Sequence, residues 1–226
     1  MNISSLLKEL HTYEDQSYKQ FHSKLGVNVP LIGVRTPILQ SIAKRIIKEQ
    51  PIDYLDHYQK TCYETDVIYG FVLGGTKLPY QKSVTYLNHL ANLIDNWATC
   101  DLTASRQKWI KQQKGPFIQE LHQLWNTKQP WKQRFVYVLL LDYYLEEMYL
   151  DLIFSFCEQP YEQEYYVQMA IAWLLSIALI KYPKQTEQYL CTCSLDDFTY
   201  NKTLQKAKES SRISANKKKQ YQMMKR

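Results

Sequence analysis

Trp97 and Asp101 are the pair of residues in this chain whose types and spacing could do chemistry. In a helix, a spacing of four places both side chains on one face, one turn apart. A carboxylate and an indole face both attract positive charge, so the pair could stabilise a cation if that face lines a cleft. Trp173 and the basic residue Arg134 could join the pair from neighbouring helices.

Each of these residues also has an ordinary role open to it. Trp97 could be a core residue, and Asp101 could be a first-turn acid that the helix dipole favours. Arg134 could lie on the surface at the start of a helix, and Trp173 stands in a segment so apolar that core packing is expected. Taken one by one, these residues do not predict a site.

The elements that must position these residues are short helices separated by Pro and Gly. Apolar residues recur at helical spacing, and no segment alternates with period two between hairpin turns, so we predict an all-α protein. The predicted helices cover residues 36–50, 51–58, 63–75, 79–94, 97–113, 117–125, 130–144, 147–158 and 164–183, with two or three more before residue 226. Helix pairs spaced by about 35 to 45 residues favour a HEAT-like solenoid that forms one domain over residues 1–226.

The predicted boundaries rest on a few local signals. Thr36 and Pro37 favour a helix start, with the hydroxyl at the N-cap and the proline at the first helical position. The paired glycines Gly74 and Gly75 look like a helix end, and Gly115-Pro116 looks like a break. Residues 4–25 contain no Pro or Gly, so they form one long helix or two with a joint near Thr12.

Charge is concentrated at one end of the chain. The net charge is +6, but residues 202–226 hold nine basic residues against the single acid Glu209. The excess of positive charge is therefore confined to the predicted C-terminal helices. Such a segment can bind a polyanion, and it is equally typical of an ordinary solvated terminus.

Several classes of function lack their motifs. The five histidines show no metal-ligand spacing, there is no glycine-rich phosphate loop, and no nucleophile has an identifiable catalytic partner, so we expect no metal and no cofactor. Five cysteines without a CxxC motif indicate reduced thiols. No signal peptide or membrane-spanning run is visible, and we expect a cytoplasmic protein without membrane contact.

Five segments spread over nearly the whole chain resemble the AlkD-like DNA alkylation repair family. In order they are GVRTP (33–37), DNWATCD (95–101), WKQRF (131–135), YYVQMAIAW (165–173) and NKTLQKAKESSRIS (201–214). The resemblance implies HEAT-like repeats curved into a C-shape, with a basic concave face that holds duplex DNA on the bacterial nucleoid. It also implies N-glycosylase action that releases cationic N3- and N7-alkylated purines.

The same resemblance assigns roles to residues. Asp101 matches the family's catalytic aspartate, Trp97 and Trp173 match its two cleft tryptophans, and Arg134 matches the arginine that contacts the DNA backbone beside the lesion. Basic residues in the matching segments are implied as further DNA contacts, namely Lys132, Lys202 and Arg212.

One departure from the family favours a second hypothesis. Active members have two N-terminal helices, and the second lies along the DNA and helps trap the lesion. Nothing in residues 4–25 clearly breaks the predicted helix, so that second helix could be missing or redirected. The alternative is a non-enzymatic relative that keeps the acidic cleft and binds DNA structure or a protein partner without base excision.

Overall fold

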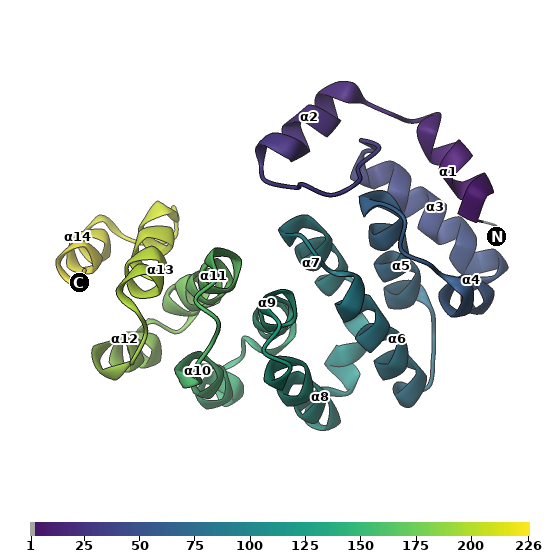
Figure 1. The fold of residues 1–226 in the computed structure, drawn as a ribbon. Coiled ribbons are helices and arrows are strands. Elements are labelled where there is room, and N and C mark those ends of the chain that lie inside the picture. Colours follow the sequence, from purple (N-terminus) through teal and green to yellow (C-terminus); the bar gives the residue numbers. More distant parts are fainter. Residues whose placement is uncertain (1–2) are drawn as a thin grey trace. The chain divides into compact units, whose positions relative to one another are not determined.

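The computed structural model describes residues 3–226, which form fourteen α-helices and no strand, so the predicted all-α helical-repeat fold is confirmed (Figure 1). The chain divides into two compact units, the first ending at His122 and the second running from Gln123 to Arg226. The predictions of a single domain and of a C-shaped curve stay predictions.

In the first unit, three helices form a row in which α5 (Tyr63–Gly75) lies between α3 (Thr36–Glu49) and α7 (Trp97–Ala104) (Figure 1). Behind this row, α4 (Pro51–His57) packs on α3 and α5, and α6 (Tyr80–Leu93) packs on α5. All eleven residues of α5 from Tyr63 to Leu73 are buried, so α5 is the core helix of this unit. Its nearly uniform burial explains why its sequence lacks an amphipathic pattern.

The second unit contains a similar row, in which α11 (Tyr165–Lys181) lies between α9 (Pro130–Leu139) and α13 (Asp197–Glu209) (Figure 1). α12 (Pro183–Thr192) packs on α11, and α14 (Ala215–Met223) packs on α13, while α10 (Leu150–Glu158) follows a short 3₁₀ turn, Glu147–Tyr149. α8 (Lys114–Asn126) spans the boundary between the two units. We call α3, α5, α7, α9, α11 and α13 the row helices.

The N-terminal segment forms two helices, α1 (Ile3–His11) and α2 (Gln16–Lys24), so the possibility that the second helix is missing is wrong. The break is produced by Asp15, whose backbone is extended. Its side chain caps α2 by accepting a hydrogen bond from the Tyr18 N–H at 3.0 Å. An N-cap aspartate is a start signal that needs neither Pro nor Gly. The alternative of two helices is therefore the correct one.

Other boundaries also differ from prediction. The helix predicted for 97–113 ends at Ala104, and a 3₁₀ helix follows at Lys108–Gln112. Gly115 and Pro116 lie in the first turn of α8, where a proline needs no hydrogen-bonded N–H, so they do not break the chain. The helix predicted for 130–144 becomes a π-helical turn after Leu139.

The basic C-terminal segment is folded onto the second unit. Tyr221 is fully buried, Lys217 pairs with Glu187 at 2.6 Å, and the Arg226 guanidinium donates to the Leu195 carbonyl at 3.0 Å. The segment is therefore not an ordinary solvated terminus, and part of its charge is already neutralised. Within residues 3–226, no helix is both long and apolar enough to cross a membrane. The cytoplasmic location stays a prediction.

Candidate functional site

The start of α7 is fixed by its own sequence. The Asn96 side chain accepts a hydrogen bond from the Thr99 N–H at 2.9 Å, which caps the helix, and its amide donates to the Asp95 carboxylate at 2.9 Å. Asn96 is buried, so this cap is shielded from competing water. The cap makes Trp97 the first residue of α7 and puts Asp101 one turn further along.

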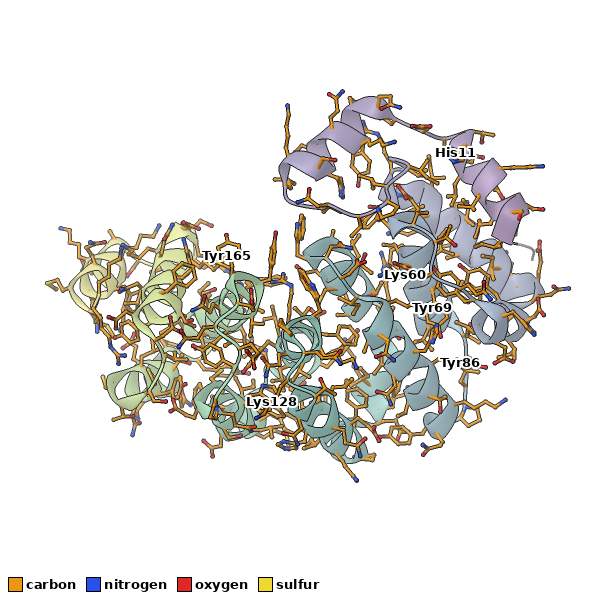
Figure 2. The ribbon with its side chains drawn as sticks, viewed as in Figure 1. His11, Lys60, Tyr69, Tyr86, Lys128 and Tyr165 are labelled. Atoms are coloured by element: carbon orange, nitrogen blue, oxygen red, sulfur yellow. The ribbon has the colours of Figure 1, made fainter. Side chains whose placement is uncertain are left out.

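The turn before α7 is tied to the core through Lys60, a residue that sequence reasoning missed (Figure 2). Its ammonium group donates to the Leu93 carbonyl at 2.6 Å and pairs with Asp95 at 2.5 Å and with Asp66 at 3.8 Å. Burial raises the pKa of Asp66 to about 6, although a hydrogen bond from Tyr58 and the charge of Lys60 oppose this shift. Lys60 therefore links a buried acid of α5 to the segment that starts α7.

The packing of α7 on α5 depends on glycines of α5. A Cβ atom on Gly70 would lie 2.4 Å from the Thr103 Cγ2 atom, and one on Gly74 would lie 2.3 Å from the Arg106 carbonyl oxygen. The Gln107 amide also donates to the Gly70 and Thr103 carbonyls, at 3.0 and 2.9 Å. This side-chain bond helps to satisfy a carbonyl of the last turn of α7, where helix carbonyls lack their usual intrahelical partners.

The prediction that a helix ends at Gly74-Gly75 is confirmed, because α5 runs to Gly75. Both residues are part of α5, and neither has a positive φ, so they do not form the left-handed cap that glycine usually supplies. A Cβ atom on Gly75 would lie 2.4 Å from the Ile47 Cδ1 atom of α3. The two glycines allow α3, α5 and the end of α7 to approach closely.

With α7 held in this way, Trp97 and Asp101 lie on the same side of the helix, and both are partly exposed. The Trp97 indole N–H donates to the Leu25 carbonyl at the end of α2, at 3.0 Å. Phe21 and Leu25 of this end are exposed, at 55% and 46%. The carboxylate of Asp101 therefore stands one turn from an indole whose N–H is already bonded and whose neighbours are exposed apolar side chains.

The position of α2 depends on Glu64 of α5, which is fully buried. Its carboxylate accepts hydrogen bonds from three successive backbone N–H groups of the loop before α3: Ile32 at 3.0 Å, Gly33 at 2.7 Å and Val34 at 3.2 Å. Three amides converging on one carboxylate form an anion-binding nest. Glu64 thereby anchors the loop that connects α2 to α3.

The loop in turn holds the start of α2. The Asp15 N–H donates to the Gly33 carbonyl at 3.1 Å, and the Arg35 guanidinium donates to the Asp15 carboxylate at 2.9 and 2.8 Å. Gly33 has φ +101°, and a Cβ atom there would lie 2.7 Å from the Asp15 carbonyl oxygen, so only glycine fits. The GVRTP segment is thus the support on which α2 rests.

In the second unit, Arg134 and Trp173 lie on adjacent row helices. The Arg134 guanidinium donates to the Tyr166 carbonyl in the first turn of α11 at 2.8 Å and lies 5.9 Å from the centre of the Tyr166 ring. Arg134 is 5% exposed, so it is buried, contrary to the ordinary expectation of a surface residue. Trp173 lies about two turns after Tyr166 on α11. It is partly exposed, so it is not a fully buried core residue.

The three further basic residues predicted to contact DNA also belong to the second unit. Lys132 stands in the first turn of α9 and is partly exposed. Lys202 of α13 lies 3.2 Å from the Gln205 side-chain oxygen and 5.8 Å from the centre of the Phe198 ring. Arg212 is exposed in the turn between α13 and α14.

The structure therefore places Trp97 and Asp101 one turn apart on α7 of the first unit. Arg134 and Trp173 form a second pair only in that they lie on the adjacent helices α9 and α11 of the second unit. That the two pairs form one centre stays a prediction. Within residues 3–226, no cluster of three or more His, Cys, Asp or Glu side chains is suited to a metal ion.

The chain matches the model of the DNA alkylation repair enzyme family over residues 5–217. No curated protein and no solved structure matches it. The match covers almost the whole chain and includes α2, both pairs of candidate residues and the basic row helix α13. The protein therefore belongs to the DNA alkylation repair enzyme family, and this membership supports a role in DNA alkylation repair with DNA as its partner.

Proposed function

We propose that the protein is a monofunctional DNA N-glycosylase that releases cationic N3- and N7-alkylated purines from duplex DNA. The observation that carries this proposal is the placement of Trp97 and Asp101 on one partly exposed side of α7, beside the end of α2. Family membership supplies DNA as the partner, and the chemistry of these two side chains suggests the reaction.

An N-alkylated purine is already a positively charged leaving group, so its departure needs no general acid. Positive charge then develops on the sugar, as in the oxocarbenium-like transition state of glycoside hydrolysis. The Asp101 carboxylate would stabilise that charge and orient the attacking water. Asp101 is the one acid among the residues proposed for the site, so a substitution that removes its negative charge tests the proposal.

Trp97 would bind the cationic base through its ring. The interaction of a cation with an indole face contributes about 0.5–2 kcal/mol, more when water is excluded. The Trp97 N–H is occupied by the Leu25 carbonyl, which leaves the ring face as the part of this side chain that a lesion can contact. Trp173 would supply the second indole from α11.

Arg134 would contact a DNA phosphate, with Lys132, Lys202 and Arg212 as further backbone contacts. Phosphate contacts fix the register of a protein on duplex DNA without reading its sequence. The burial of Arg134 limits this role, because one of its donors already holds the Tyr166 carbonyl. Arg134 therefore also orients α9 against α11, whatever contact it makes with DNA.

The test is single-turnover release of 7-methylguanine from a defined duplex. We expect Asp101→Asn to slow release by about 10²–10³-fold, the usual loss when a preorganised electrostatic group is removed. Asp151→Asn is the matched control, because Asp151 is an exposed acid on α10. Equal release by the wild type and Asp101→Asn, with circular dichroism showing that both are folded, would refute the role of Asp101.

The second candidate is a non-enzymatic relative that binds DNA structure or a protein partner without base excision, and it is favoured by the burial of Arg134, which limits the phosphate contact expected beside a lesion. A missing second N-terminal helix would also have favoured it, but α2 is present. Salt-dependent DNA binding without release of any alkylated base would support a DNA-binding relative, and absence of DNA binding at low salt would point to a protein partner.

A further inference from the structure

A pocket of about 270 Å³ in the first unit, bounded by α3, α5 and the end of α7, has an unusual lining. Its polar lining consists of three cations and one amide: Lys44, Arg106, Lys108 and Gln40. No acidic residue lines it, while Ile47 and Phe71 contribute an apolar floor. We call it the basic pocket.

The three cations of the basic pocket have no partner of opposite charge in the described part of the chain. Two other arginines of the same unit are paired, Arg35 with Asp15 and Arg45 with Glu9. The Arg106 guanidinium lies 5.0 Å from the centre of the Phe71 ring, which orients it over the floor and leaves its N–H groups without a protein acceptor. Three like charges around one small pocket attract an anion into it.

The helix dipole does not account for this arrangement. Cations are favoured near helix C-termini, which applies to Arg106 and Lys108 just after α7. Lys44, however, stands in the middle of α3, where the dipole has no comparable effect. The glycines of α5 also contribute, since Gly74 and Gly75 bring the Arg106 backbone and the Ile47 side chain close to α5.

We propose that the basic pocket binds one phosphate group of the DNA backbone, with the adjoining deoxyribose against the apolar floor. A phosphodiester presents a negative charge and several acceptor oxygens, which suit an arginine and two lysines. The pocket lies among the row helices of the first unit, which include the α7 helix of Trp97 and Asp101. The inference rests on DNA being the partner, but it does not depend on base release.

The test is the salt dependence of binding to an unmodified duplex, measured by fluorescence anisotropy. We compare the wild type with the pocket variant Lys44→Gln/Arg106→Gln/Lys108→Gln. A single phosphate contributes about 0.9 to the slope of log K against log salt concentration. We therefore expect the slope of the pocket variant to be smaller by about 0.9. The ratio of the wild-type binding constant to that of the variant should then be roughly eightfold larger at 0.1 M salt than at 1 M salt.

The matched control removes three charges from the same unit outside the pocket. Lys8→Gln/Lys77→Gln/Lys82→Gln alters exposed lysines of α1, the α5–α6 loop and α6. The proposal requires a larger loss of slope for the pocket variant than for this control. Equal behaviour of the two variants overturns it, and a fall of about 2.7 also overturns it, because that value indicates three separate phosphate contacts.

Misfolding of the pocket variant and binding of free phosphate are each checked by one further measurement. Thermal unfolding of the pocket variant and of Lys44→Gln alone checks folding. Lys44→Gln alters only an exposed side chain, so it must weaken DNA binding if the proposal holds.

Inorganic phosphate at millimolar concentration distinguishes the source of the anion. If it stabilises the wild type against heat while the pocket variant binds DNA normally, the pocket takes free phosphate, and the proposal is wrong. Loss of base release in other experiments leaves this result unaffected.

Discussion

The anchor formed by Glu64 gives the sharpest test of how the first unit is built. Its carboxylate is fully buried and accepts hydrogen bonds from the N–H groups of Ile32, Gly33 and Val34. These residues are themselves buried, so water cannot replace the carboxylate without a movement of the loop. The loop supports α2, whose last carbonyl binds Trp97. A change at Glu64 should therefore affect the loop, α2 and Trp97 in that order.

The magnitude follows from the number of bonds lost. Glu64→Ala leaves three buried N–H donors without an acceptor, and each costs about 1–3 kcal/mol, so we expect a loss of at least about 3 kcal/mol. Glu64→Gln keeps an acceptor oxygen but replaces charge-assisted bonds with neutral ones. Because neutralisation also relieves the desolvation of a buried charge, we expect this variant to lose only about 1–3 kcal/mol.

The assay combines urea unfolding with hydrogen exchange of individual amides. In Glu64→Gln we expect faster exchange at residues 32–34, followed by the amides of α2, while α5 and α6 stay protected. Glu49→Gln, at the exposed end of α3, is the control and should change neither stability nor exchange. Unchanged protection of residues 32–34 in Glu64→Ala would show that the loop does not depend on this carboxylate, and the reasoning would fail.

Two other predictions concern the contacts that hold α7. Burial raises the pKa of Asp66 to about 6 from an ordinary value of 3.8, so the folded state keeps its proton at pH values where the unfolded chain has lost it. The contribution of this group to the free energy of unfolding therefore falls as pH rises from about 4 to 6. In urea unfolding, the free energy of unfolding of Asp66→Asn relative to that of the wild type should rise by about 3 kcal/mol across that range. A constant difference between pH 4 and 7 would contradict this. Gly70→Ala should destabilise the protein by about 1–3 kcal/mol, because its Cβ atom would overlap Thr103. Gly115→Ala is the control for thermal unfolding, since a Cβ atom there meets nothing within 4 Å. Equal melting temperatures of Gly70→Ala and Gly115→Ala would refute the close packing of α5 and α7.

Those parts of the fold that depend on local chain chemistry were predictable from the sequence. Proline at the start of a helix acts through its own ring geometry, so α3, α4 and α9 begin within one residue of Pro37, Pro51 and Pro130. Helical spacing of apolar residues indicated the all-α class for the same reason. The pair of Trp97 and Asp101 was predictable as well, because a spacing of four on one helix brings side chains together without any tertiary information.

Contacts between distant segments were not predictable in this way. Leu25 binds Trp97 through a backbone carbonyl, an atom that every residue has, so its identity contains no signal. Glu64 resembles any polar residue of a helix until the loop amides surround it. Gly74 was predictable as part of a helix end, but its second role in close packing is revealed only by the position of Arg106. Asp15 was a missed signal that local chemistry offered, as an N-cap for α2.

The contact between Trp97 and Leu25 shows what a tryptophan at position 97 does that a phenylalanine could not. Phenylalanine would present a ring face to a cation but has no N–H for the Leu25 carbonyl. The indole does both, since its N–H lies at the ring edge and donates at 3.0 Å to α2 while its face stays available. The same side chain holds the end of α2 and would contact the proposed lesion. α2 and the pair on α7 consequently form one structural unit, in which the loop anchored by Glu64 also sets the orientation of the indole beside Asp101.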